Sequence, residues 1–112
     1  MAKRTEIKRF NNFILYRDEG VASNNTPVDG LVVKSIGLAE KHVVDVDMDS
    51  FNNEYNGTPI KYKYSKVYVR HGMRGRQDTL AETKEYIDVL NEAIDVAFEV
   101  QKYCILNGYW AG

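Results

Sequence analysis

Short runs of apolar and β-branched residues alternate with turn-forming residues through the first half of the chain. Residues 13–16 predict a first strand, which the pattern extends back toward Ile7, and residues 31–36 predict a second. The polar stretch between them, residues 18–30, is rich in turn-forming residues and predicts a loop. Segments this short with β-type composition indicate a sheet in this half of the chain.

The third predicted strand, residues 42–48, has the clearest alternation. Its apolar residues share one face and its acidic residues the other: Val44, Val46 and Met48 against Asp45 and Asp47. The short break at residues 37–41 predicts that the second and third strands form a hairpin.

Residues 60–71 predict a long fourth strand that changes register. Tyr62 and Tyr64 share one face, whereas Val67 has the opposite parity. A bulge near Ser65 would reconcile the two halves, and a strand buried on both faces is the alternative. The bulge would place a basic and aromatic set on one side of the strand: Lys61, Lys63, Lys66, Tyr68 and Arg70.

The second half of the chain predicts a helix. Thr79 and Glu82 form a capping box, helix-forming residues continue to Leu106, and Gly108 supplies a left-handed stop. Unbroken, the helix would be roughly 40 Å long, so a kink or a split into two helices is the alternative. The sequence therefore predicts a single α+β domain of 112 residues, with an antiparallel sheet of about four or more strands followed by a long C-terminal helix.

Two apolar stripes run along this predicted helix. The isoleucine stripe comprises Ile87, Leu90, Ile94, Ala97, Phe98 and Ile105. The valine stripe comprises Tyr86, Val89, Ala93, Val96, Val100 and Tyr103, spaced as in a coiled-coil seam. Together they cover about twice the arc that a surface helix presents to one core. We expect one stripe to cover the sheet and the valine stripe to form a homo-oligomer interface. The alternative is that the sheet and the tail of the same chain enclose the helix on both sides.

Composition limits the possible partners. An apolar content of 44% is typical of a globular protein, and a net charge of −1 gives no overall attraction to nucleic acid or an anionic membrane. The longest apolar runs are too short to span a bilayer, so we expect no membrane partner. The first residues carry no apolar secretory segment, which predicts a cytoplasmic protein.

The connection from the fourth strand to the helix holds the sharpest local feature. Three arginines and a histidine precede a helix N-terminus, where free amides attract anions: Arg70, His71, Arg74, Arg76 and Thr79. Arginine forks suit phosphate oxygens, and Lys66 and Tyr68 would extend the site if the bulge exists. Alternatively, the arginines pair with the acidic helices of neighbouring subunits or are solvated. Trp110 either stacks on a ligand base or, with Tyr109, docks onto the core.

Catalytic and metal-binding patterns are missing from the sequence. Residues 45–56 start like a calcium loop but lack its glycine and its final glutamate. His42 and His71 have no ligand spacing, and Cys104 lies in an apolar helical segment that predicts a packed thiol. We therefore expect a non-enzymatic protein without a cofactor or metal.

Three functions are compatible with these features. The first is binding of a small phosphorylated ligand, such as a nucleotide signal, by an oligomer. The second is a protein-interaction module or inhibitor that docks through an exposed apolar helix face. The third is binding of single-stranded nucleic acid through Lys61, Lys63 and Lys66, which the near-zero net charge makes the least favoured.

The chain is small and rich in Asn, Lys and Tyr, and it combines a β-rich first half with a long helix and a strong oligomer pattern. In this layout it resembles small phage-encoded anti-defence proteins that sequester nucleotide immune signals. The resemblance implies sequestration without turnover, and it transfers no site residue.

Overall fold

The computed structural model describes residues 3–21, 25–36, 42–50, 59–73 and 80–112. In chain order the elements of these ranges are β1 (Lys3–Arg9), β2 (Phe13–Val21), β3 (Pro27–Ser35), β4 (His42–Ser50), β5 (Ile60–Lys61), β6 (Tyr64–Met73) and α1 (Leu80–Leu106). This confirms the predicted α+β fold, in which strands are followed by one long C-terminal helix.

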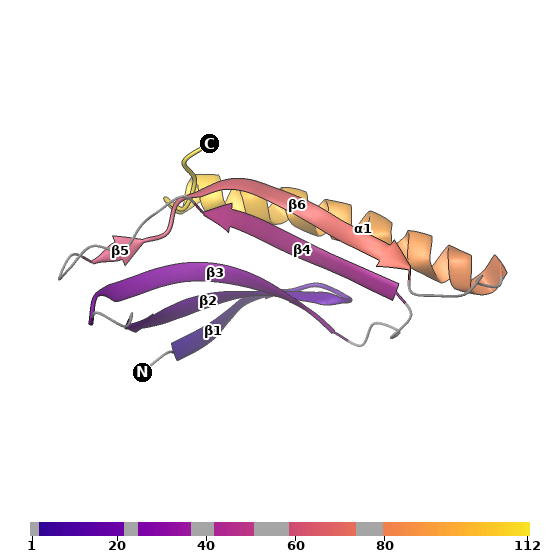
Figure 1. The fold of residues 1–112 in the computed structure, drawn as a ribbon, viewed down its shortest axis with the longest axis horizontal. Coiled ribbons are helices and arrows are strands. Elements are labelled where there is room, and N and C mark those ends of the chain that lie inside the picture. Colours follow the sequence, from indigo (N-terminus) through magenta and orange to yellow (C-terminus); the bar gives the residue numbers. More distant parts are fainter. Residues whose placement is uncertain (1–2, 22–24, 37–41, 51–58, 74–79) are drawn as a thin grey trace.

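The strands form two hydrogen-bonded groups, in the order β1-β2-β3-β5 and β4-β6. All pairs are antiparallel except β3 with β5, which is parallel. Figure 1 shows α1 lying along β4 and β6, while β3, β2 and β1 follow on the far side of β4. Among the described residues, no helix combines the length and the apolar character needed to cross a bilayer.

The prediction of a single strand up to residue 16 was wrong, because the structure has a hairpin there. β1 and β2 flank a turn in which the Phe10 N–H donates to the Phe13 carbonyl at 2.8 Å. Ile7 is an extra residue in the β1 ladder, between Glu6 and Lys8. Every β1 residue except Ile7 is exposed, so β1 has no apolar alternation by which the sequence could reveal it.

The predicted loop at residues 18–30 was also largely wrong. The β2–β3 ladder continues without interruption from the pair Phe13–Ser35 to the pair Val21–Pro27. Its polar residues are paired across strands, as in the bidentate contact between Arg17 and Asp29. Cross-strand ion pairs thus support a two-stranded ribbon whose composition is typical of a loop.

Residues 31–36 and 42–48 were predicted to pair as a hairpin, and this prediction was wrong. β3 and β4 belong to separate hydrogen-bonded groups, although they are spatial neighbours. At Leu31, the backbone edge of β3 bonds to the hydroxyl of Tyr64 instead: the Leu31 N–H donates to it at 2.8 Å, and it donates to the Leu31 carbonyl at 3.1 Å. A side chain therefore occupies the position that a partner strand would take.

The predicted fourth strand is divided into β5, which pairs with β3, and β6, which pairs with β4. The predicted bulge is confirmed, because Asp49 pairs with Lys66 and Ser50 with Tyr64, leaving Ser65 as the extra residue. Beyond the bulge, Lys66, Tyr68 and Arg70 share a face and lie across from the β4 aspartates Asp49, Asp47 and Asp45.

The prediction that the valine stripe forms an oligomer interface was wrong. Val96 and Val100 are 1% and 0% exposed within the single chain, Tyr86 and Ala93 are buried, and Val89 and Tyr103 are partly buried. The stripe shares one core cluster with residues of two strands, β2 and β4: Phe13, Leu15, Val44 and Val46. The isoleucine stripe carries the exposed residues instead: Ile87, Ile94, Phe98 and Ile105. Ala93, Val96, Val100 and the adjacent Cys104 are small enough to let the helix approach the sheet closely.

α1 is one continuous helix, without the kink or split considered above. It starts directly after Thr79, which itself lies outside the described residues, as does the side chain of Glu82. Its end is the predicted one: Gly108 has φ = 78°, and the Tyr109 N–H donates to the Cys104 carbonyl at 2.8 Å. Lys61 and Lys63 donate to the carbonyls of Asn107 and Gly108 at 2.6 Å, which places positive charge at the negative end of the helix dipole.

Candidate functional site

A cleft of about 540 Å³ lies between β3 and β4, and we call it the β3–β4 cleft. It is lined by residues 31–35 of β3, residues 45–48 of β4, and Tyr68 and Arg70 of β6. Its volume falls within the range of small-molecule sites, roughly 300–1,000 Å³. The cleft exists because β3 and β4 are neighbours without a ladder between them.

Arg70 is the best-positioned cationic group of this cleft. Its Nη2 lies 3.1 Å from Asp45 and its Nε 3.3 Å from Asp47. The hydrogen bond to Asp45 and the charge of Asp47 raise the pKa of Arg70. The side chain is nevertheless 65% exposed, so the two carboxylates orient the guanidinium without enclosing it. A guanidinium has five N–H donors, so this fork can also meet an acceptor from solvent.

Tyr68 supplies an aromatic surface next to Arg70 on β6. The ammonium group of Lys66 lies 4.7 Å from the centre of the Tyr68 ring. Burial, together with the charges of Asp49 and Asp47, raises the pKa of Tyr68. Its phenol is therefore neutral at physiological pH.

Two predicted ligand residues do not reach the cleft. The ring Nδ1 of His71 lies 2.7 Å from the hydroxyl of Tyr86 on α1, so His71 belongs to the helix-facing side of β6. Trp110 forms a bridge beside Tyr64, six residues from Arg70 and thus roughly 20 Å away along an extended strand. The predicted grouping of Arg70 with His71 and Trp110 is therefore wrong. Arg74, Arg76 and Thr79 lie outside the described residues.

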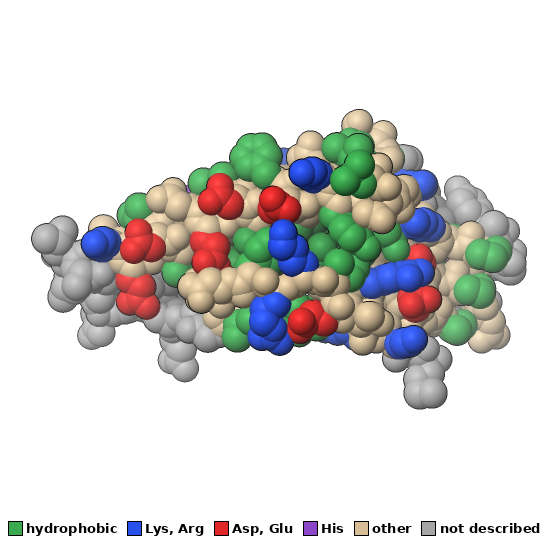
Figure 2. Space-filling view, turned by 180° about the vertical axis from the view of Figure 1, so that it is seen from behind, with side chains coloured by type: hydrophobic (Ala, Val, Ile, Leu, Met, Phe, Trp, Pro, Cys, Tyr) green, Lys and Arg blue, Asp and Glu red, His purple; other side chains and the backbone are tan. Residues whose placement is uncertain are grey.

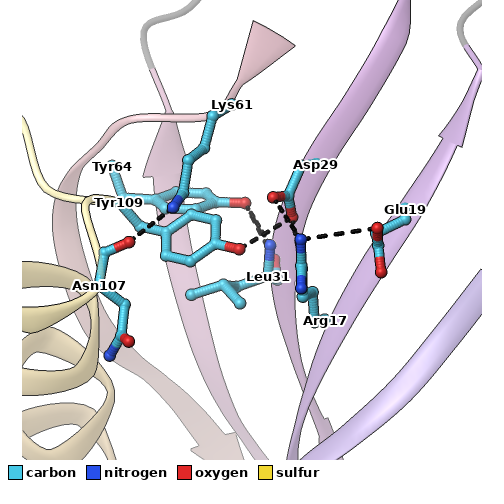
Figure 3. A network of polar contacts seen from close by, with 8 residues as sticks. All are labelled: Arg17, Glu19, Asp29, Leu31, Lys61, Tyr64, Asn107 and Tyr109. Atoms are coloured by element: carbon cyan, nitrogen blue, oxygen red, sulfur yellow. Dashed lines mark hydrogen bonds and ion pairs between the residues drawn. The ribbon is translucent and has the colours of Figure 1, made fainter. Parts of the chain in front are cut away.

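A second polar cluster fastens the end of the chain to the sheet, and we call it the tail clamp: Arg17, Asp29, Lys61, Tyr64 and Tyr109. Figure 3 shows the Tyr109 hydroxyl and the Arg17 guanidinium converging on Asp29. Tyr109 donates to Asp29 Oδ1 at 2.9 Å, and Arg17 donates to both carboxylate oxygens at 3.0 Å. The ammonium group of Lys61 lies 4.1 Å from the centre of the Tyr109 ring.

The tail clamp confirms that Tyr109 docks onto the core, where it is buried. The tail adds two backbone bonds: Tyr64 N–H to the Tyr109 carbonyl at 2.7 Å, and Ala111 N–H to the Tyr64 carbonyl at 2.9 Å. The sequence gives no signal for Arg17 and Asp29 as a pair, because only the β2–β3 register brings them together. Since the donors and acceptors of the clamp satisfy one another, we assign it a structural role.

The clamp makes an acid-sensitive contribution to stability. Burial raises the pKa of Asp29, but the hydrogen bonds from Arg17 and Tyr109 outweigh it, and the net pKa lies below the ordinary value of 3.8. A carboxylate with a depressed pKa in the folded state stabilises fully above its unfolded pKa of about 3.9, and the contribution disappears as the pH falls through the folded value.

We therefore expect Asp29→Asn to be less stable than wild type at pH 7 and to lose less stability between pH 5 and pH 2. Tyr109→Phe, which removes one of the three hydrogen bonds to Asp29, should fall between the two proteins in its pH dependence. Urea unfolding midpoints measured across this range test the expectation. Parallel pH curves for wild type and Asp29→Asn would contradict it.

Cys104 fits the prediction of a packed thiol. It is fully buried in the core, and burial raises the pKa of the thiol to about 11. Within the ranges that the structure describes, no group of three or more His, Cys, Asp or Glu side chains could hold a metal ion.

Comparison with protein-family models, with curated proteins and with solved structures gives no match for this chain.

Proposed function

We propose that this protein binds a small phosphorylated ligand of nucleotide size in the β3–β4 cleft and sequesters it without chemical change. The observation that carries the proposal is the guanidinium of Arg70, oriented by Asp45 and Asp47 at the cleft and still 65% exposed. A fork held in place loses less side-chain entropy when it meets a phosphate oxygen. Sequestration without turnover is also what the resemblance to phage anti-defence proteins implies.

Other cleft residues support binding of a nucleotide in particular. Tyr68 offers a ring on which a base can stack, a contact worth about 1–3 kcal/mol per base. Lys34 lines the cleft and supplies a second positive charge. Asp45 and Asp47 oppose an anion, so each phosphate contact has to compete with the existing ion pairs.

Because of this competition, substitution of Arg70 and substitution of its aspartate partners should change the affinity for the ligand in opposite directions. We expect ADP to bind by isothermal titration calorimetry and adenosine to bind at least tenfold more weakly. Arg70→Ala should weaken ADP binding at least tenfold, because it removes the fork. Asp45→Asn and Asp47→Asn should tighten it several-fold, because each removes a carboxylate that repels phosphate.

Arg4→Ala is the matched control, since Arg4 forms a similar exposed cross-strand pair with Asp18 on β1 and β2, away from the cleft. It should leave ADP binding unchanged. Native mass spectrometry of the freshly purified protein should show a retained phosphorylated mass that Arg70→Ala removes. The proposal fails if no phosphorylated compound binds or co-purifies, or if Arg70→Ala binds ADP like wild type.

A second function, docking onto another protein through an apolar helix face, is supported by the exposed isoleucine stripe, with Phe98 69% exposed. Binding of single-stranded nucleic acid has less support, because Lys61 and Lys63 donate to the end of α1 rather than forming one surface with Lys66.

A further inference from the structure

Four of the five large apolar residues of α1 that are exposed within the described residues fall on one narrow line, and the fifth, Leu106, lies off it. Phe98 is 69% exposed and Ile105 54%, and Ile87 and Ile94 are also exposed. Figure 2 shows hydrophobic side chains reaching the surface between acidic and basic ones on the side of the molecule where α1 lies. Single exposed apolar residues are ordinary, but a row of them along a helix marks an interaction surface.

These residues, with two amides between them, have the spacing of a coiled coil. We call them the outer seam: Ile87, Asn91, Ile94, Phe98, Gln101 and Ile105. The intervals alternate between four and three residues, so the side chains repeat every 3.5 residues on average and can face a second helix along the whole seam. The valine stripe has the same spacing, and the protein's own sheet covers it.

The pattern of apolar and amide residues in the outer seam, and the spacing between them, is the same in both directions. In an antiparallel pair of these helices, Ile87 meets Ile105 of the second copy and Ile94 meets Phe98 of the second copy. Asn91 then meets Gln101 of the second copy, so amide faces amide and apolar faces apolar. A twofold axis needs such a self-complementary surface, in which each contact occurs twice.

The flanking charges distinguish the two possible orientations. In the antiparallel pair, Asp88 lies next to Lys102 of the second copy, which gives two ion pairs by symmetry and leaves one repulsive contact between the two copies of Asp95 at the axis. A parallel pair would place Asp88 and Lys102 beside Thr83 and Ala97, without any pair of opposite charges.

A hollow beside the seam accommodates the bulkiest side chain. A cavity of about 240 Å³ is lined by Val67, Tyr68 and Val69 of β6 and by Ile94, Ala97, Phe98 and Gln101 of α1. Ile94 is the residue that Phe98 of the second copy meets in the antiparallel register. The aromatic ring of each copy can therefore enter the hollow of the other, as a knob enters a hole.

We infer that α1 pairs with α1 of a second copy of this chain, in antiparallel orientation, through the outer seam. The resulting dimer has one twofold axis near the centre of the helix, and its interface borders the β3–β4 cleft at Tyr68, which lines both the cleft and the hollow. The inference does not depend on the proposed ligand, because the same seam would form with the cleft empty.

Sedimentation at about ten micromolar tests the association. We expect the wild type to be a dimer and Phe98→Glu a monomer with an unchanged circular dichroism spectrum, its dissociation constant raised at least 100-fold. Val21→Glu is the matched control, since Val21 is 52% exposed at the end of β2, and it should stay dimeric. A wild-type monomer, or a dimer that persists in Phe98→Glu, would overturn the inference.

Cysteine cross-linking tests the orientation. Residues 87 and 105 lie about 27 Å apart along one helix, so Ile87→Cys and Ile105→Cys should each form no disulfide alone and should cross-link when mixed. Buried Cys104 should stay unreactive in the wild-type control. Self-cross-linking of either single variant, without the mixed product, would indicate a parallel pair and overturn the proposed register.

Discussion

Tyr109→Ala is expected to lower the free energy of unfolding by about 3–5 kcal/mol, the range for truncating a buried aromatic side chain. Tyr109 is buried, its hydroxyl donates to Asp29, and its ring stacks on Tyr103 with 6.3 Å between the ring centres. The substitution leaves a cavity and removes the side chain that holds the tail. In a domain of this size the melting temperature should fall by more than about 10 °C.

Two companion variants separate the causes. Tyr109→Phe keeps the ring and loses only the bond to a charged acceptor, so a loss of about 1.5 kcal/mol is expected. Leu106→Ala, at a residue exposed near the same end of α1, should change stability by less than about 0.5 kcal/mol. Urea unfolding with circular dichroism gives all three values. A loss below about 1 kcal/mol for Tyr109→Ala would show that the tail does not dock as described.

Tyr64→Phe is expected to lower the free energy of unfolding by about 1–3 kcal/mol, because it leaves two buried backbone groups without a hydrogen-bond partner. The Tyr64 hydroxyl accepts from the Leu31 N–H and donates to the Leu31 carbonyl, and both residues are buried. Phenylalanine keeps the packing but offers neither group a partner. Beside this site, a Cβ on Gly30 would come within 2.9 Å of the Tyr62 ring and 3.0 Å of the Tyr64 hydroxyl, so both tyrosines pack closely against the Gly30 backbone.

Hydrogen exchange measured by NMR locates the effect. The Leu31 amide should exchange faster in Tyr64→Phe than in wild type, by more than the change in global stability requires. Tyr62→Phe is the control: Tyr62 is half-buried beside Tyr64, and its hydroxyl makes no hydrogen bond within the described ranges. Equal protection of Leu31 in both variants would contradict the bridging role of Tyr64.

Local patterns predicted the parts of the fold that depend on neighbouring residues. The alternation in residues 42–48 corresponds to β4, with Val44 and Val46 buried. The parity change in residues 60–71 located the bulge at Ser65, and Gly108 marked the end of α1. In each case the feature depends on consecutive residues, either as a backbone conformation or as a hydrophobic periodicity of two or 3.6 residues.

Contacts between distant segments had no such signal. The hairpin of β1 and β2 was missed because β1 is exposed and polar, and the ribbon at residues 18–30 is stabilised by ion pairs between strands. Within the candidate site, Arg70 was predicted from the arginine-rich connection before the helix, and Tyr68 from its place after the bulge. Their aspartate partners were seen only as an exposed strand face, since the pairing depends on the β4–β6 register.

The sequence alone determined that this helix has more apolar surface than one sheet can cover, because hydrophobic periodicity is a property of the helix itself. Only the tertiary structure decided that the valine stripe faces the sheet and the isoleucine stripe faces outward. The physical reason is steric: the small side chains of Ala93, Val96 and Val100 fit closely against the strands, whereas Phe98 does not have to fit there. The buried face of the helix was selected by how well its side-chain volumes fit one particular sheet surface. A helical wheel does not contain that information.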